Sequence, residues 1–383
     1  YFKENNTFIP SKNTRKLLFE QIKPFINNES RILEPFALTG EFVHQLNSMD
    51  ISFNLTILEE NKDLFDHLNN KYNNDNYDIF NDSFLKLSPP HNFRKFNIII
   101  GAPPSKLIDK KTSIGSRFKH WFVDKTDIYS LYFMRAIDLL YNDGIIAFIL
   151  PDSFLNASYI QMLRNKIVNQ GSIIHMQRLS NLFTRTTYNT ILVVFQKNIA
   201  NKNNYTYISN KLPFFDFNPD KYESLLKNTK FLNKLNCKIR NGFITKHNPN
   251  RNNNVQNIPI LYNKNIESDN TLKLYKSNKQ YISSEYIDFD IIKKPSLIIS
   301  KFYGNADDEY KINCALCTLE KYVCNDNLFI ITFPHLSHEN SVMLIYDIIK
   351  SFNSPNMKIW KETHLKNGIL TKYQIKHYLP LFI

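Results

Sequence analysis

The stretch Phe96-Asn97-Ile98-Ile99-Ile100-Gly101-Ala102-Pro103-Pro104-Ser105 is the most specific segment of the sequence. Its β-branched run predicts a buried strand, because such side chains pack well on a pleated sheet. Two prolines follow almost directly, and since each proline fixes its own φ angle, the backbone beyond the strand is rigid. The same pattern also suits a loop that does no more than end a strand.

Short apolar runs alternate with helical patterns on both sides of this stretch, through the first 200 residues. The alternation predicts an α/β domain with a doubly wound, Rossmann-like sheet. We expect helices over residues 15–26, 41–46, 63–72, 128–140 and 159–168. Strands are expected over residues 31–34, 55–58, 77–80, 96–100, 144–150, 173–176 and 190–195.

The pattern changes after about residue 200. Short strand-like runs such as 296–300 are then separated by long polar connections such as 246–257. We therefore expect two domains, a catalytic-type domain over residues 1–220 and a second, irregular β-containing domain over residues 221–383.

The composition of the 383 residues sets further limits. Hydrophobic residues make up 43%, which excludes disorder of the whole chain. No run approaches the roughly 18 apolar residues of a membrane span, and no signal peptide pattern opens the chain. Four cysteines do not make a disulfide scaffold. We expect an intracellular protein, in cytoplasm, nucleoid or a viral compartment, without a membrane partner.

The net charge of +13 indicates a polyanionic partner, with a solvated basic surface as the alternative. Residues 102–125 hold six Lys/Arg against two Asp, and residues 221–301 hold fifteen Lys/Arg against six acids, so these two segments account for the whole surplus. We expect nucleic-acid contacts in the first segment at Lys106, Lys110, Lys111, Arg117 and Lys119, and in the second at Lys246 and Arg251.

Three acids follow three successive predicted strands: Glu34, Glu59 and Asp82. In an open α/β sheet the carboxyl ends of the strands line one crevice, where acids can accept hydrogen bonds from amine and hydroxyl groups of a ligand. Each acid alone could equally be a helix cap. The turn after Glu34 keeps one glycine, Gly40, whereas a dinucleotide-binding fingerprint needs three.

The segment that opened this section resembles motif IV of the amino-methyltransferases, Asn-Pro-Pro-aromatic. In this setting the chain resembles the TaqI-type (γ-class) adenine-N6 DNA methyltransferases of restriction-modification systems. The likeness runs in motif order over nearly the whole chain, through residues 33–42, 127–133 and 143–151, and weakly through 295–333 and 365–379, where the family has its target-recognition domain. The resemblance thus implies that residues 1–220 are the methyltransferase domain and residues 221–383 the DNA target-recognition domain.

The resemblance implies an S-adenosylmethionine site, a double-stranded DNA partner and a flipped target adenine. By position in the motifs, the cofactor-binding residues would be Glu34, Pro35, Phe36, Gly40, Glu59, Asp82 and Phe84. The catalytic positions would be Ala102, Pro103, Pro104 and Ser105, with Phe183 stacking on the flipped base. Methyl transfer is direct, so positioning and electrostatics dominate and no metal is needed.

Motif IV departs from the family at its two chemical positions. Ala102 stands in place of the acceptor Asn, and Ser105 in place of the aromatic residue. The chain is then either a degenerate relative or carries a single inactivating replacement at residue 102. A catalytically silent DNA-binding or scaffold subunit with a protein partner is the alternative function. An RNA or protein methyltransferase is the third.

A zinc site is the other chemistry that we considered. Cys314, Cys317 and Cys324 with His335 and His338 supply ligand types. Their spacing is not that of a familiar finger, and the apolar residues between the first two cysteines suit the interior of a strand. We therefore predict no metal.

Overall fold

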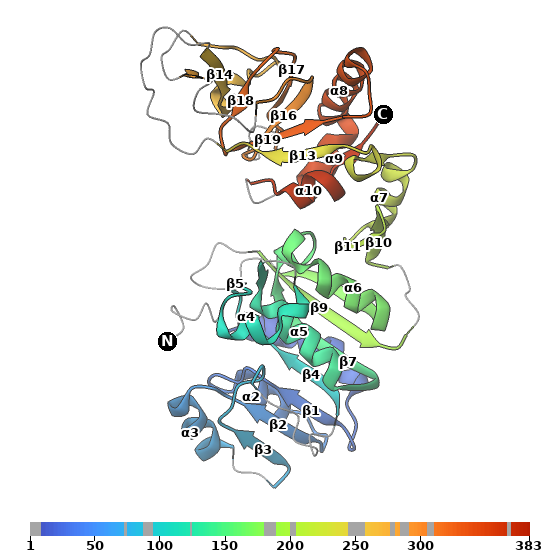
Figure 1. The fold of residues 1–383 in the computed structure, drawn as a ribbon. Helices are drawn as coiled ribbons and strands as arrows, with labels where there is room; N and C mark the ends of the chain where they lie inside the picture. Colours follow the sequence, from blue (N-terminus) through green and yellow to red (C-terminus); the bar gives the residue numbers. More distant parts are fainter. Residues whose placement is uncertain are drawn as a thin grey trace. The chain divides into compact units, whose positions relative to one another are not determined.

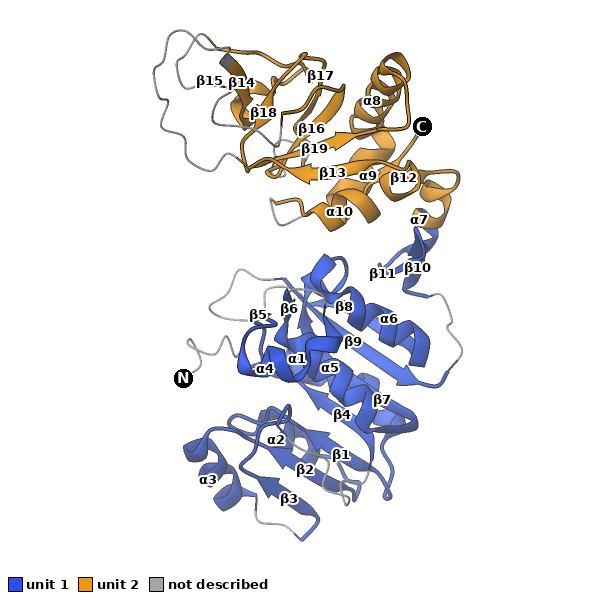
Figure 2. Ribbon diagram, in the orientation of Figure 1, with its two compact units in different colours: residues 1–221 blue, residues 222–383 orange. Residues whose placement is uncertain are grey.

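The computed structural model describes residues 9–72, 75–86, 95–122, 125–179, 189–199, 204–243, 257–275, 280–283, 291–304, 310–365 and 369–383. The chain forms two compact units, Tyr1–Lys221 and Tyr222–Ile383, drawn in blue and orange in Figure 2. The functional roles expected for residues 1–220 and 221–383 stay predictions.

The first unit is built on a seven-stranded sheet with the strand order β3-β2-β1-β4-β7-β9-β8 (Figure 1). The strands are β1 (Arg31–Glu34), β2 (Asn54–Leu58), β3 (Tyr77–Phe80), β4 (Phe96–Gly101), β7 (Leu140–Pro151), β8 (Gly171–Leu179) and β9 (Thr190–Lys197). All pairs are parallel except those of β9, which is antiparallel to β7 and β8. The order reverses between β1 and β4, so the loops after these two strands flank the switch point where ligands bind in such sheets.

Helices cover both faces of this sheet. They are α1 (Lys12–Ile22), α2 (Glu41–Asn47), α3 (Lys62–Lys71), α5 (Ile128–Leu139) and α6 (Gln161–Gln170). Ile99 packs in a core with residues of α5 and α6, whereas Ile98 and Ile100 pack in a second core with residues of α1, α2 and α3. Successive strand residues point to opposite faces, so the apolar run of β4 supplies both cores.

The order of elements predicted for this unit is confirmed. Strands 31–34 and 77–80 have the expected bounds, and the other strands and helices differ at their ends. The first helix ends at Ile22 rather than residue 26, and a 3₁₀ turn, Lys23–Phe25, follows it. Pro24 explains the difference, because it has no amide hydrogen to continue the helix and restricts the residue before it.

An insertion between β4 and α5 consists of β5 (Leu107–Asp109), α4 (Ser113–Arg117), the 3₁₀ turn η2 (Lys119–Trp121) and β6 (Lys125–Asp127). β5 and β6 pair antiparallel. The last part of the first unit holds the hairpin of β10 (Thr206–Ser209) and β11 (Leu212–Phe215), and α7 (Pro219–Leu226) crosses into the second unit.

Among its described residues, the second unit contains short strands, the end of α7 and three further helices, as the sequence predicts for an irregular β-containing domain. A four-stranded antiparallel sheet has the order β13 (Lys238–Asn241), β19 (Leu328–Thr332), β16 (Ser296–Ser300), β17 (Cys314–Cys317). A smaller sheet has the order β15 (Tyr281–Ser283), β14 (Asn257–Leu261), β18 (Val323–Cys324), and β12 (Lys230–Phe231) pairs with β20 (Pro380–Leu381). The helices are α8 (His338–Phe352), α9 (Pro355–His364) and α10 (Lys372–His377).

Gly40, which precedes α2, has a left-handed conformation with φ 82°. A Cβ atom there would lie 2.6 Å from Cε2 of Tyr72. We therefore expect Gly40→Ala to lower the free energy of unfolding by at least about 2 kcal/mol, since a left-handed non-glycine residue alone costs about 1–2 kcal/mol. Ser48→Ala, at the exposed end of the same helix, is the control and should change it by less than about 0.5 kcal/mol. Equal urea midpoints for both variants would contradict this account.

Candidate functional site

The three strand-end acids lie at one edge of the sheet, because β1, β2 and β3 are adjacent and parallel. Their surroundings differ. Glu34 is completely buried and Glu59 is 4% exposed, whereas Asp82 is exposed and accepts a hydrogen bond from the amide N–H of Ser83 at 2.6 Å. The structure thus encloses two of the three acids and leaves the third at the surface.

Glu34 ends β1 inside the protein. Neither carboxylate oxygen has a hydrogen bond of standard geometry among the described residues. Burial raises the pKa of Glu34 well above its ordinary value, and the nearby carboxylates of Glu41 and Glu59 raise it further, with an opposing contribution from the amide N–H of Val43. A buried acid in these surroundings favours its neutral form until a cationic partner approaches.

Glu59 is held by backbone amides from two loops. The N–H of Leu38, after β1, donates to its Oε2 atom, and the N–H of Asn61, after β2, donates to its Oε1 atom, both at 2.8 Å. Burial raises the pKa of Glu59, while these hydrogen bonds oppose the rise. The carboxylate therefore fixes the loops on both sides of the expected cofactor position.

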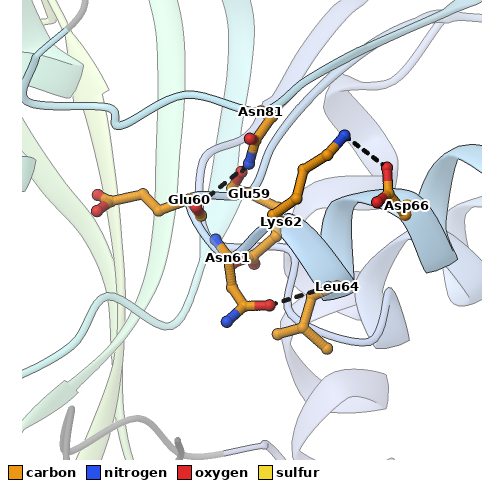
Figure 3. A network of polar contacts seen from close by, with 7 residues as sticks. All are labelled: Glu59, Glu60, Asn61, Lys62, Leu64, Asp66 and Asn81. Carbon is orange, nitrogen blue, oxygen red and sulfur yellow. Dashed lines mark hydrogen bonds and ion pairs between the residues drawn. The ribbon is translucent and has the colours of Figure 1, made fainter.

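Asn81 is a site residue that the sequence did not single out. Its Nδ2 atom donates to the carbonyl oxygens of Glu59 at 2.8 Å and Glu60 at 3.2 Å (Figure 3). Asn61 in the same figure caps α3, accepting from the amide of Leu64 at 3.0 Å. In the sequence, Asn81 is recognisable only as a polar residue directly after a predicted strand, and many loops begin with such a residue.

A pocket of about 570 Å³ opens at this edge of the sheet. Five residues predicted from the sequence line it: Pro35, Phe36, Glu59, Pro104 and Lys106. Further lining residues include Leu38, Glu60, Ser83, Lys86, Ile108, Ile128 and Tyr132. The loop after β1, the loop after β2 and motif IV thus contribute to one cavity, which is mostly apolar and carries a few charged groups at fixed positions.

Phe36 is the bulky residue of the loop after β1. Its ring packs edge-on against Tyr132, with 4.6 Å between ring centroids, and against Phe84, with 5.9 Å. Gly101 makes room for it, since a Cβ atom at Gly101 would lie 3.1 Å from Cδ2 of Phe36. Phe84 is 1% exposed and belongs to the core rather than to the pocket lining.

Motif IV follows β4 directly. Ala102 packs against the core shared with α1 and α2, Pro103 is buried, and Pro104 reaches the pocket. Ser105 turns to Asp127, with its Oγ atom 2.7 Å from Oδ2 of that residue. Ser105 therefore anchors the loop instead of lining the pocket.

Asp127, also missed as a site residue, holds this loop in place. Its Oδ1 atom accepts from the amides of Lys106 at 2.9 Å and Tyr129 at 3.3 Å, and the second contact caps α5. Burial raises the pKa of Asp127, and the hydrogen bonds from Ser105, Lys106 and Tyr129 oppose that rise. A carboxylate directly before a helical run was the available signal for this cap.

The remaining basic residues of the first segment lie in the insertion after motif IV. Lys111, Arg117 and Lys119 are exposed, and Lys110 is half-buried. The guanidinium of Arg117 donates to the carbonyl of Lys86 at 3.2 Å. Phe183, Lys246 and Arg251 lie outside the described residues.

Cys314 and Cys317 lie in β17, in agreement with a strand interior. Burial raises the pKa of Cys314 to about 12 and that of Cys317 to about 11, so both thiols stay protonated at neutral pH. In the part of the chain that the structure describes, no group of three or more His, Cys, Asp and Glu could hold a metal ion. No helix there combines the length and apolar composition that a membrane crossing needs.

The topology and the strand-end site define the class: the first unit is a Rossmann-like sheet of the S-adenosylmethionine-dependent methyltransferase type, as predicted. Residues 14–184 match the family described as Eco57I restriction-modification methylase. Over these residues the chain is similar to the restriction-modification methylases, which confirms the resemblance to DNA methyltransferases of such systems. The adenine-N6 specificity stays a prediction.

Individual proteins are also similar to this chain. The modification methylase CviBIII of Paramecium bursaria Chlorella virus NC1A is 23% identical over 85% of this chain and 82% of its own length. The type II methyltransferase M.BsuBI of Bacillus subtilis is 30% identical over 22% of this chain and 17% of its own length. Among solved structures, the type IIG restriction endonuclease BpuSI is 12% identical, with a TM-score of 0.47, over 97% of this chain and 58% of its own.

The buried carboxyl of Glu34 gives a prediction about stability and pH. Its raised pKa means that the folded chain keeps a proton that the unfolded chain releases, so its protonation favours folding at low pH. This contribution is lost as pH rises from the ordinary glutamic acid range through the raised pKa. We expect Glu34→Gln to be more stable than the parent at pH 8, with a smaller difference at pH 5, in urea unfolding.

The exposed Glu29→Gln variant is the control, because it makes the same charge change at the surface. It should shift the urea midpoint by the same small amount at both pH values. A stability gain for Glu34→Gln that grows toward low pH would contradict the assignment of Glu34 as a buried, unfavourably charged group.

Proposed function

We propose that this chain binds S-adenosylmethionine and belongs functionally to the adenine-N6 DNA methyltransferases, with a flipped adenine as acceptor. The observation that carries the proposal is that Phe36, Glu59 and Pro104 of motif IV line one and the same pocket. Its volume lies in the range of roughly 300–1,000 Å³ typical of cofactor sites. The match to the restriction-modification methylases supports DNA as the substrate.

The residues of the pocket suit this cofactor. Phe36, Ile108 and Pro104 offer apolar walls for a ring, and Glu59 offers a carboxylate for ribose hydroxyl groups. Glu34 does not line the pocket but directly precedes the lining residue Pro35; its carboxylate has no hydrogen bond of standard geometry among the described residues and suits a positively charged group of the ligand. When bound, S-adenosylmethionine supplies a methyl group activated on a sulfonium.

The protein's part in the reaction is positioning. The target adenine must leave the duplex stack, because its N6 atom is otherwise engaged in pairing. The rigid Pro103-Pro104 backbone, anchored by Asp127 through Ser105 and Lys106, would then hold the edge of the base. Phe183 keeps its predicted role as the stacking residue.

Ala102 limits the rate in this proposal. Its methyl group offers no acceptor for the amine hydrogens of adenine, whose hydrogen bond would make N6 a better nucleophile. Loss of one hydrogen bond made in the transition state costs about 2.7–4 kcal/mol, or roughly 100- to 1,000-fold in rate. The chain as it stands would therefore transfer methyl groups slowly.

A second candidate is a catalytically silent DNA-binding subunit. Two observations favour it: Ala102 packs against the core, and the Ser105 hydroxyl is bound to Asp127 rather than directed into the pocket. In this case the pocket would bind the cofactor, or the unit would serve a protein partner, without methyl transfer.

Restoring the acceptor separates the two candidates. We expect Ala102→Asn to raise methyl transfer to mixed-sequence DNA by roughly 100- to 1,000-fold, measured with a radiolabelled methyl donor. Ala102→Asn combined with Glu59→Gln is the control and should fall back toward the parent rate, because the cofactor carboxylate is lost. An Ala102→Asn variant that binds the cofactor and stays as slow as the parent would support the silent subunit.

The cofactor site has its own test by calorimetry. We expect Glu59→Gln to weaken S-adenosylmethionine binding about 10- to 100-fold, because a hydrogen bond to a charged group contributes about 1.5–3 kcal/mol. Asp66→Asn, at an exposed ion pair on the neighbouring helix, should leave the affinity unchanged. Absence of binding to the parent protein at millimolar ligand would overturn the enzyme proposal.

A further inference from the structure

The sheet order separates the cofactor pocket from the loop that follows β7. The loops after β1, β2 and β3 and the chain after β4 line the pocket, and no described residue after β7 does. Strand β7 pairs with the other side of β4 in parallel, with Phe148 opposite Gly101, so the two strands end at the same edge. A methyl acceptor that approaches motif IV from the side away from the pocket therefore meets the loop after β7.

Asp152 is the first residue of this loop, and the fold holds its backbone in place. Its N–H donates to the carbonyl of Asn189 at 3.0 Å, and its own carbonyl accepts from the N–H of Leu155 at 3.0 Å. Asp152 begins the 3₁₀ turn η3 (Asp152–Phe154), whose last ring is fully buried. Asp152 itself is half-buried, so its carboxyl group is held near one place and stays accessible to water.

The connection between β8 and β9 begins and ends beside this loop. Pro151 pairs with Thr190, and Thr190 pairs with Leu179 at the end of β8. In the sequence, this connection carries the predicted stacking residue, Phe183. Asp152 therefore lies between motif IV and the described ends of that connection.

Asp152 also lies near the carboxylate that anchors motif IV. Burial raises the pKa of Tyr159, its hydrogen bond with Ser153 opposes the rise, and the negative charges of Asp127 and Asp152 raise the pKa further. One phenol is thus close to both carboxylates. Asp127 is 4% exposed and accepts three hydrogen bonds from the protein, whereas Asp152 is half-buried, so Asp152 is the more accessible of the two.

Methyl transfer to an amine requires the loss of a proton. As the N6 atom of adenine bonds to the methyl carbon, the carbon–sulfur bond breaks and its electron pair stays on sulfur. The nitrogen is then positively charged until one of its hydrogens leaves as a proton. A carboxylate that accepts this proton typically accelerates a reaction about 100- to 10,000-fold. The amine has two hydrogens, so this role is separate from that of the acceptor that Ala102 lacks.

We propose that Asp152 is the proton acceptor for the amine of the flipped adenine. The N6–H bond breaks, an O–H bond forms on the carboxylate, and the neutral carboxyl group then passes the proton to water. This inference rests on the proposed function and deepens it, because it assigns a catalytic residue outside motif IV.

The first test measures the rate of methyl transfer to mixed-sequence DNA in single turnovers. We expect Asp152→Asn and Asp152→Ala each to lower this rate about 100-fold or more, both in the parent and in Ala102→Asn, because neither side chain takes up a proton. Added formate should raise the rate of Asp152→Ala at least about tenfold, since a small carboxylate can occupy the space of the lost side chain. Formate should leave the parent rate unchanged.

Asp50→Ala is the control, because Asp50 is an exposed acid of the same unit that does not line the cofactor pocket. It should keep the rate within about twofold of the parent. An Asp152→Asn rate within about threefold of the parent would overturn the inference, because the amide would then serve as well as the carboxylate. A loss in Asp152→Ala that formate does not reverse would also overturn it, since it would indicate a structural role for the turn.

The second test measures binding of the amine without methyl transfer. With S-adenosylhomocysteine saturating the cofactor pocket, the parent should bind 2′-deoxyadenosine about tenfold more tightly than purine 2′-deoxyriboside, which lacks the amine, because a hydrogen bond to a charged group contributes about 1.5–3 kcal/mol. Asp152→Ala should bind the two nucleosides equally in the same NMR titration. Equal affinities in the parent would overturn the inference.

Failure of the proposed function gives a different result. A parent that does not bind S-adenosylhomocysteine, or the absence of methyl transfer by both the parent and Ala102→Asn, would overturn the proposed enzyme and this inference with it. The outcomes named for Asp152 overturn the inference alone, because they require a protein that binds the cofactor and transfers methyl groups.

Discussion

The buried carboxylate of Glu59 is the interaction on which the geometry of the strand-end crevice depends. It accepts one backbone hydrogen bond from Leu38, after β1, and another from Asn61, after β2. Asn81, after β3, secures the same segment through the carbonyls of Glu59 and Glu60. A buried charge needs such partners, so the loops after three parallel strands are held in one arrangement around the pocket.

Two contacts fix the position of motif IV, one at each end. Gly101 accommodates the ring of Phe36, which stands in the loop after β1. Asp127 accepts hydrogen bonds from Ser105 and Lys106, and so anchors the end of the motif to the start of α5. The loop is well positioned even though Ala102 and Ser105 lack the chemical groups of the resembled family. A substitution in motif IV can therefore change its chemical groups without changing the position of its backbone.

The structure shows where the basic residues of the chain lie in each of the two units. The insertion after motif IV carries Lys106 to Lys119 beside the pocket of the first unit. In the second unit, exposed lysines lie in residues 227–240 and in α10, and the 3₁₀ turn Leu232–Lys234 of the first segment packs against α10. The polyanionic partner expected from the net charge of +13 thus has candidate contact surfaces in each unit.

The sequence by itself determined the α/β order, the strand-end acids and motif IV, because hydrophobic period and proline chemistry act over a few neighbouring residues. It predicted Glu59 and Pro104, which line one pocket. Only the tertiary structure decided that Phe84 is a core residue, that Ser105 binds Asp127 and that Lys376 adjoins the segment of Cys237. These outcomes depend on contacts between residues 22 to more than 130 positions apart, or on which face of the sheet a ring occupies, and no local pattern encodes either.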